Sequence, residues 1–200
     1  MPRIIPEYKE EVRKKIIGIA YQLFLSRGYQ GTTMEDIAGA LGVTKPALYQ
    51  YFPGKEDLYA AVAEHGRQEL RGILERSYQN RDILRGSAEL FDAISRYAPQ
   101  YQGIYSEMML IAPRNERIRQ ILEEDLREDV LVIERFISGQ QEAGFVSSRL
   151  TAHELAVAFH AIVNGLLLDM MAGMDKKEAK KTWIIIVEAL TGTGHPPGFK

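Results

Sequence analysis

The fold of this chain is decided by residues 33–52, which read TMEDIAGALGVTKPALYQYF. Thr33 is a typical helix N-cap with Asp36 three positions later, and Gly42 ends the short helix that they begin. Thr44 caps a second short segment, which runs to about Phe52 and is ended by the next two residues, Pro-Gly. Two short helices joined by a tight turn have the size of a helix-turn-helix, whose second helix enters the major groove of DNA.

A longer amphipathic helix is predicted just before this stretch, over about residues 7–27, and Gly28 closes it. Six residues are spaced to be buried between the three helices: Ile37, Ala38, Leu41, Val43, Leu48 and Phe52. The outward Tyr-Gln-Tyr that remains is costly unless something covers it. Spacing alone leaves two interpretations open, a DNA-binding head or a small three-helix subdomain whose tyrosines pack on the rest of the chain.

Helical spacing of apolar residues continues to the end of the chain, and alternating strand patterns are hard to find. We expect all-α architecture with about nine helices, divided into a head over residues 1–55 and a larger helical body over residues 56–200. Further helices are predicted from about residue 56 into the seventies and over about 82–98, 103–112, 115–143, 151–173 and 176–191. The break between 98 and 103 is expected because Pro99 and Gly103 both weaken a helix.

Composition excludes several classes of protein. Hydrophobic residues make up 46% of the 200 residues and charged residues 26%, which is typical of an ordinary globular protein. The most apolar stretch, residues 161–173, is interrupted by Asn164 and Asp169, so no membrane span is expected, and no signal peptide is recognised. With no cysteine, the expected location is cytoplasmic. The net charge is −2, but residues 1–55 carry +3 and residues 56–200 carry −5, a distribution that a localised DNA contact would also have.

The head resembles the amino-terminal domain of the TetR family (TetR/AcrR) of bacterial and archaeal transcription regulators. The residues at the family's signature positions are Leu23-Phe24, Gly28, Thr32-Thr33, Ile37-Ala38, Gly42-Val43-Thr44, Leu48-Tyr49, Tyr51-Phe52 and Lys55-Glu56-Asp57-Leu58. The match covers a quarter of the chain and departs at Ala47, where many members carry Gly or Thr. This departure affects which base is read.

The resemblance implies a role in binding double-stranded DNA for nine residues. They are Thr33, Thr44, Lys45, Pro46, Ala47, Tyr49, Gln50, Tyr51 and Lys55. The two threonines are expected to present helix N-termini to phosphates, and Tyr49, Tyr51 and Lys55 to hold the backbone. Lys45 is expected to reach a guanine edge or a phosphate, Ala47 a thymine methyl and Gln50 an adenine. Pro46 stiffens the start of the helix.

The body is expected to form a homodimer, which the resemblance implies and the residues support. One face of helix 151–173 is made of small residues, and the last helix is apolar all the way round. The expected interface residues are Ala158, Ala161, Gly165, Leu168, Ala172, Trp183, Ile184 and Val187. The alternative is a last helix covered inside its own domain. A two-fold dimer would read a palindromic operator.

The resemblance also implies a pocket for a small-molecule effector, and its expected position is the break near Pro99. The candidate lining residues are Tyr97, Tyr101, Tyr105, Met108, Met109, Phe136, Phe159, His160 and Asn164. Methionine and aromatic residues suit an adaptable apolar site, with His160 and Asn164 as the polar pair that orients a ligand. The alternative is that these residues are plain core, and the pair a satisfied histidine and a buried amide.

Together these observations predict a ligand-responsive transcription regulator, a repressor by the family's usual mode, released from DNA by a hydrophobic effector. One alternative is a DNA-binding dimer controlled by a protein partner. Another is a helical enzyme, which is disfavoured because no phosphate loop, nucleophile elbow or paired catalytic acids are found. The four histidines are too scattered for a metal site. No cofactor, metal or membrane partner is expected.

Overall fold

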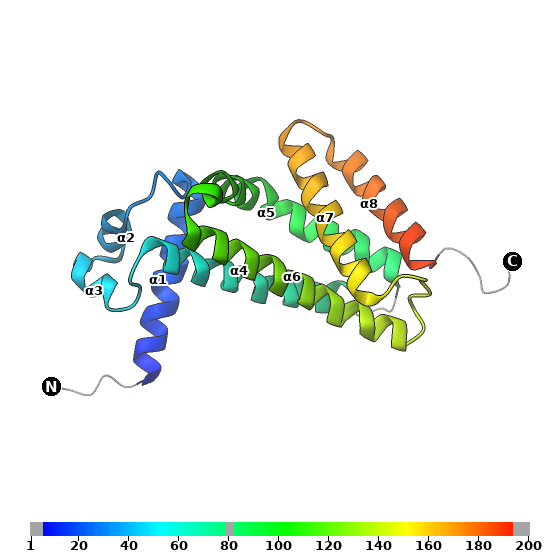
Figure 1. The fold of residues 1–200 in the computed structure, drawn as a ribbon, viewed down its shortest axis with the longest axis horizontal. Helices are drawn as coiled ribbons and strands as arrows, with labels where there is room; N and C mark the ends of the chain where they lie inside the picture. Colours follow the sequence, from blue (N-terminus) through cyan, green and yellow to red (C-terminus); the bar gives the residue numbers. More distant parts are fainter. Residues whose placement is uncertain (1–5, 79–81, 194–200) are drawn as a thin grey trace, which may run out of the picture. The chain divides into compact units, whose positions relative to one another are not determined.

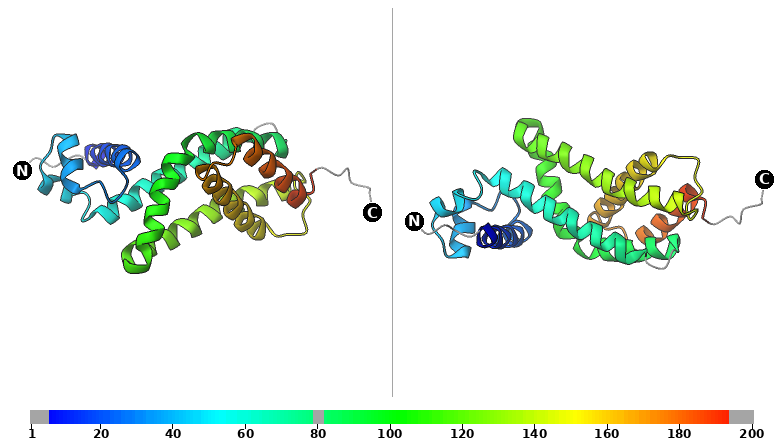
Figure 2. Two further views of the ribbon diagram at one scale, coloured as in Figure 1. Left: turned by 90° about the horizontal axis from the view of Figure 1, so that it is seen from above. Right: turned by 90° about the horizontal axis from the view of Figure 1, so that it is seen from below.

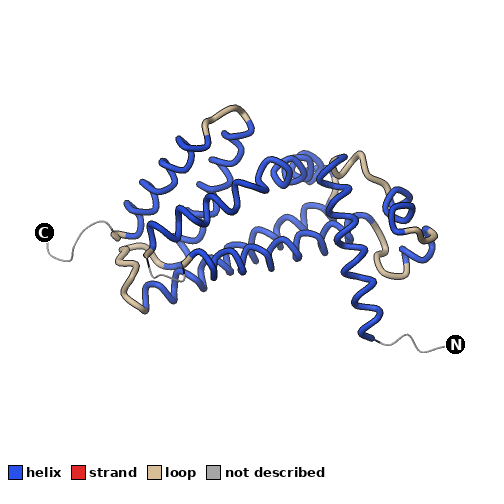
Figure 3. Tube along the Cα trace, turned by 180° about the vertical axis from the view of Figure 1, so that it is seen from behind, coloured by secondary structure: helices blue, strands red, loops and turns tan. Residues whose placement is uncertain are grey.

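A computed structural model describes residues 6–78 and 82–193, and every regular element within these ranges is a helix (Figure 3). The helices are α1 (Pro6–Arg27), α2 (Met34–Leu41), α3 (Lys45–Tyr49), α4 (Lys55–Ser77), α5 (Ile83–Ile111), the short 3-10 helix η1 (Ala112–Arg114), α6 (Glu116–Glu142), α7 (Ala152–Met171) and α8 (Lys176–Thr191). Figure 1 follows them along the chain. The predicted all-α class is confirmed.

One predicted boundary is wrong. The helices expected over 82–98 and 103–112 form the single helix α5, which passes through Pro99 and Gly103. A proline inside a helix removes one backbone hydrogen bond, but most helical stability in proteins comes from packing of an apolar face. On one side of the proline, α5 buries Leu90 and Phe91, and on the other it buries Ile104 and Met108. The break expected after residue 112 is present, at η1, which contains Pro113.

The chain divides into two compact units. The first unit contains the residues up to Gly66 together with Gly103–Glu123, and the second contains Arg67–Gln102 and the residues from Glu124 onward. Each unit has a hydrophobic core of its own. Helices α4, α5 and α6 each contribute residues to both units.

The core of the first unit explains how α1, α2 and α3 are held as a group (Figure 2). Phe24 from α1, Ile37 from α2 and Leu48 from α3 are fully buried, and Phe52 is 1% exposed. Of the six residues expected between these helices, Leu41 is only half-buried and Val43 is 46% exposed. Val43 follows the turn glycine, where the chain leaves the core, so the expectation that it is buried is wrong.

In the second unit, α7 and α8 lie side by side as a helical hairpin (Figure 1). A reciprocal capping box starts α7, in which the Thr151 hydroxyl accepts from the Glu154 N–H and the Glu154 side chain accepts from the Thr151 N–H. Trp183 of α8 is buried, and its indole N–H donates to the Ser87 carbonyl at 2.9 Å. The Trp183 ring packs edge to face with Phe159 of α7, with ring centroids 5.4 Å apart.

The interruptions at Asn164 and Asp169 led us to expect no membrane span. By length and composition alone, however, helix α7 is long and apolar enough to cross a membrane. In this structure it is a partly covered helix of the second unit. Leu155, Ala156 and Phe159 are among its core residues, whereas other apolar residues are exposed. A core helix of a water-soluble protein passes the same test.

Candidate functional site

The candidate site in the first unit is built on α2, the turn after it and α3. Gly42 ends α2 in the left-handed conformation at φ 69°, and its N–H bonds back to the Ala38 and Gly39 carbonyls. The Val43 N–H also donates to the Ala38 carbonyl, at 3.0 Å. Thr44 caps α3 through its backbone, because its carbonyl accepts from the Ala47 and Leu48 N–H groups, while its hydroxyl makes no cap hydrogen bond. This hydroxyl is therefore not used by the helix.

Most of the candidate DNA-binding residues lie together on the outer face of α3. Thr44, Lys45, Pro46 and Gln50 are exposed, and Tyr49 is 41% exposed. Ala47 is half-buried, and so is Tyr51, which packs against the core of the first unit. A short helix with polar and aromatic side chains on its outer face has groups that can donate to phosphates and base edges.

Lys45 is oriented by two neighbours in this face. Its ammonium forms an ion pair with the Glu35 carboxylate of α2 and lies 5.8 Å from the centre of the Tyr49 ring. The hydrogen bond from Lys45 holds the pKa of Glu35 below its ordinary value, and the same bond raises the pKa of Lys45. Glu35 was not among the expected site residues. The sequence does contain a signal for this ion pair, because Glu35 lies in the first turn of α2 and Lys45 begins α3, two helices that are joined by a short turn.

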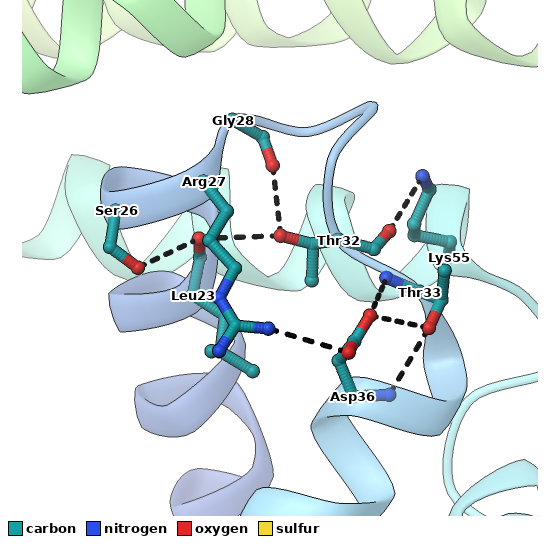
Figure 4. Close-up of polar contacts among 8 residues, drawn as sticks. All are labelled: Leu23, Ser26, Arg27, Gly28, Thr32, Thr33, Asp36 and Lys55. Carbon is teal, nitrogen blue, oxygen red and sulfur yellow. Dashed lines mark hydrogen bonds and ion pairs between the residues drawn. The ribbon is translucent and has the colours of Figure 1, made fainter.

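Thr33 has a different environment from Thr44. Its hydroxyl accepts from the Asp36 N–H at 3.1 Å and donates to Asp36 Oδ2 at 2.5 Å, and the Thr33 N–H donates to the same oxygen at 2.8 Å (Figure 4). These bonds from Thr33 lower the pKa of Asp36, and Arg27 lies 3.3 Å from Asp36 Oδ1. The hydroxyl of Thr33 is thus engaged in capping α2.

Lys55 binds the turn between α1 and α2. Its Nζ donates to the Tyr29 carbonyl at 2.8 Å and to the Thr32 carbonyl at 2.9 Å, the second of which is drawn in Figure 4. Nζ also lies 4.1 Å from the centre of the Tyr29 ring, and partial burial lowers the pKa of Lys55. Two of its three N–H groups are therefore used inside the protein, which makes Lys55 a positioning residue for the start of α2.

Glu107 of α5 binds the same turn, and sequence reasoning missed it. Its Oε2 accepts from the Gln30 N–H at 3.0 Å, 77 residues away in sequence. Gly28 begins this turn at φ 74°, and a Cβ at Gly28 would lie 2.2 Å from Glu107 Oε1. Local sequence contains no signal for a contact of this separation.

The expected dimer residues divide into two groups. On α7 and its C-cap, Ala161 and Ala172 are exposed, Leu168 is 44% exposed, and Ala158 and Gly165 are half-buried. On α8, Ile184 is half-buried, but Trp183 is 2% and Val187 1% exposed. This corrects the expectation for Trp183 and Val187: both are core residues of their own unit, since α8 packs on α7 and α5 with that face.

The expected pocket residues do not form one group. Tyr97 and Tyr101 lie outside the side chains that the structure describes. Met108 is fully buried in the core of the first unit with Tyr105 packed against it, and Met109 is 46% exposed. Phe136 and Phe159 belong to the core of the second unit.

His160 and Asn164, the expected polar pair, are brought together on α7. The Asn164 side-chain nitrogen lies 3.1 Å from His160 Nε2 and donates to the His160 carbonyl at 3.0 Å. Two residues that sequence reasoning missed join them: Gln102 of α5 donates to Asn164, and Asp129 of α6 lies 3.9 Å from His160 Nε2. Burial lowers the pKa of His160. Among residues 6–78 and 82–193, no group of three or more His, Asp or Glu side chains is placed to hold a metal ion.

Residues 16–62, which include α2, the turn and α3, match the model of the family described as bacterial regulatory proteins, tetR family. Residues 16–62 are therefore a TetR-family domain. The TetR-family match ends inside α4, so it covers the candidate site and leaves the whole second unit outside it.

Two relatives and one solved structure extend the comparison. The transcriptional activator FasR of Mycolicibacterium smegmatis is 33% identical over 111 residues, which cover 53% of this chain and 51% of FasR. The chain thus aligns with about half the length of FasR. The transcriptional regulator TtgR of Pseudomonas putida is 27% identical over 184 residues, covering 84% of this chain and 83% of TtgR. A structure from Rhodococcus sp., described as a TetR-family transcriptional regulator, aligns with a TM-score of 0.76 at 18% identity over 91% of this chain and 99% of its own. This likeness shows the fold.

Proposed function

We propose that the chain is a transcription regulator that binds a palindromic DNA operator through α2 and α3. The observation that carries this proposal is the outer face of α3, where Thr44, Lys45, Tyr49 and Gln50 are exposed while Leu48 is buried. The hydroxyl of Thr44, which makes no cap hydrogen bond, and the N-terminus of α3 are suited to a phosphate. Lys45 and Gln50 are the side chains for base edges. The regulators FasR and TtgR support the same function.

The regulator acts as a homodimer in this proposal, with α7 and α8 as the interface. Val157, Ala161 and Leu168 of α7 and its C-cap residue Ala172 are exposed and recur at helical spacing. Met171 of α7 and Ile185 of α8 are also exposed, at 48% and 54%. An exposed apolar stripe on a soluble protein marks an interaction site, and small residues within it permit close approach of a second helix. Two copies related by a two-fold axis present two recognition helices to two half-sites.

A small molecule bound in the body releases the operator in this proposal, and the regulator acts as a cytoplasmic repressor. Helix α4 starts at Lys55, which binds the turn before α2, and continues into the second unit. A shift of α4 is therefore transmitted to the head through a continuous helix. FasR is an activator, so the sign of regulation needs its own measurement.

The test is selection of random duplex DNA by the purified protein without ligand, followed by a salt titration of the selected sequence. We expect a palindromic sequence whose affinity falls steeply with salt, because phosphate contacts release counterions. Sedimentation of the free protein and of the complex gives the number of chains. A folded dimer that enriches no sequence overturns the proposal, and so does a monomer that binds a single half-site.

A further inference from the structure

A partly buried polar cluster, with Gln102 fully buried, lies inside the second unit and is formed by side chains from three helices. Gln102 of α5 is 1% exposed, and its Nε2 donates to both the main-chain and the side-chain oxygen of Asn164, each at 3.3 Å. His160 lies one turn before Asn164 on α7, and Asp129 of α6 lies 3.9 Å from His160 Nε2. The side chains of His160 and Asp129 are 17% and 25% exposed. Four polar side chains thus lie together in a unit whose core is otherwise apolar.

The two oxygens of Asn164 fix the orientation of the Gln102 amide. Because only the amide nitrogen can donate to both of them, Nε2 must face Asn164 and Oε1 must point away from it. Oε1 is buried and has no hydrogen-bond donor in the part of the chain that the structure describes. Buried carbonyl oxygens nearly always have a partner, and one without a partner destabilises the fold. Gln102 is therefore poorly explained as a core residue.

The chemistry of the cluster restricts what would complete it. Oε1 of Gln102 can only accept a hydrogen bond, and the carboxylate of Asp129 is an acceptor with negative charge. Burial lowers the pKa of His160, so its imidazole is neutral at physiological pH and supplies no positive charge. A carboxylate or phosphate would meet acceptors and negative charge, whereas an N–H or O–H donor would satisfy Oε1.

We propose that this cluster is the polar end of the effector site, and that it takes a molecule whose polar group donates hydrogen bonds, an amine or a hydroxyl. The proposal rests on the function proposed above and names the chemical class of the effector. Gln102 binds the donor through Oε1, while Asn164 holds the Gln102 amide in place and His160 packs against Asn164. The contact of Gln102 is direct, and the role of Asn164 is positioning.

The test compares three probes of matched size, 2-phenylethylamine, 2-phenylethanol and phenylacetate, by thermal melting of the full chain at about 10 mM, a concentration suited to ligands of so few atoms. We expect the amine or the alcohol to raise the melting temperature in a dose-dependent way and phenylacetate to leave it unchanged. Gln102→Met keeps the length of the side chain and removes the acceptor. It should raise the half-saturating concentration of the amine or alcohol at least tenfold. Gln120→Met, on the exposed surface of α6, is the matched control.

The free variants give a second readout, which needs no ligand. Gln102→Met should melt within a few degrees of the parent chain, because the loss of the two Nε2 hydrogen bonds to Asn164 is offset by removal of a buried acceptor that has no donor. A purely structural Gln102 would instead give a lower melting temperature. The proposal is overturned by stabilisation with phenylacetate, by an unchanged response of Gln102→Met, or by no shift with any of the three probes. Operator binding by Gln102→Met without ligand separates this result from the proposed function: loss of the ligand response with DNA binding intact leaves that function standing.

Discussion

Replacing Gly28 with alanine tests how the turn between α1 and α2 is held. Gly28 adopts φ 74°, a left-handed conformation that costs a residue with a Cβ about 1–2 kcal/mol. The new Cβ would also lie 2.2 Å from Glu107 Oε1. Because that oxygen is the end of a flexible side chain, the carboxylate moves and loses its bond to the Gln30 N–H, which adds about 1 kcal/mol at an exposed site. The expected total is about 2–3 kcal/mol.

Gly42 provides a matched control in the same unit. It has φ 69°, and a Cβ there would meet nothing within 4 Å. Gly42→Ala should therefore cost only the conformational part, about 1–2 kcal/mol. In urea denaturation, Gly28→Ala should be less stable than Gly42→Ala by about 1 kcal/mol, or about 2–4 °C in melting temperature.

A double-mutant cycle with Glu107→Ala isolates the contact. Without the Glu107 carboxylate, Gly28→Ala should cost no more than Gly42→Ala, so the two substitutions at positions 28 and 107 should be coupled by about 1 kcal/mol. Strictly additive effects, or equal costs of the two glycine substitutions in the parent chain, would show that Glu107 does not hold the turn.

Four further predictions concern the head and the body. Lys45→Ala should weaken operator binding and change the base preferred in each half-site, as measured by repeating the selection; an unchanged preference would remove Lys45 from base recognition. Leu168→Glu places a charge in the exposed apolar stripe of α7 and should convert the dimer to monomer in sedimentation, and a persistent dimer would move the interface elsewhere. Trp183→Phe loses the bond to the Ser87 carbonyl and should cost about 1–3 kcal/mol in urea denaturation, whereas a cost near zero would contradict the buried geometry. Burial lowers the pKa of His160 below its ordinary value of 6.5, so the stability that is present above pH 6.5 is lost as the pH falls below it. His160→Gln should therefore reduce the fall in melting temperature between pH 7 and pH 5. An equal fall in both proteins would refute the assignment.

Local spacing predicted those parts of the fold that depend on residues close in sequence. The capping box of α2 needs Thr33 and Asp36 three positions apart, and the end of that helix needs a glycine at Gly42. Both signals lie within one helical turn of the structure that they predict. The same holds for the cap that Thr151 and Glu154 form at α7.

Long-range contacts decided the features that local spacing did not predict. The interruption expected at Pro99 is overcome because α5 buries residues on both sides of it. Trp183 was expected at an interface because its helix is apolar on all sides, yet which side meets the chain's own core depends on Ser87, 96 residues away. The contacts of Lys55 to Tyr29 and Thr32, which span 26 and 23 residues, were also not predicted, while its contact to phosphate stays a prediction. Gln102 and Asn164, 62 residues apart, meet for the same reason.

The two side chains that hold the turn before α2 set a rule for building chimeric regulators. Lys55 reaches the turn from the first residue of α4, and Glu107 reaches it from α5, far outside the 55-residue head. A head transplanted onto the body of another relative with a junction before Lys55 would lose the first contact, and any junction near residue 55 would lose the second unless the recipient carries a carboxylate at the equivalent of Glu107. Exchange of operator specificity between such proteins is therefore best attempted by grafting the outer face of α3 alone.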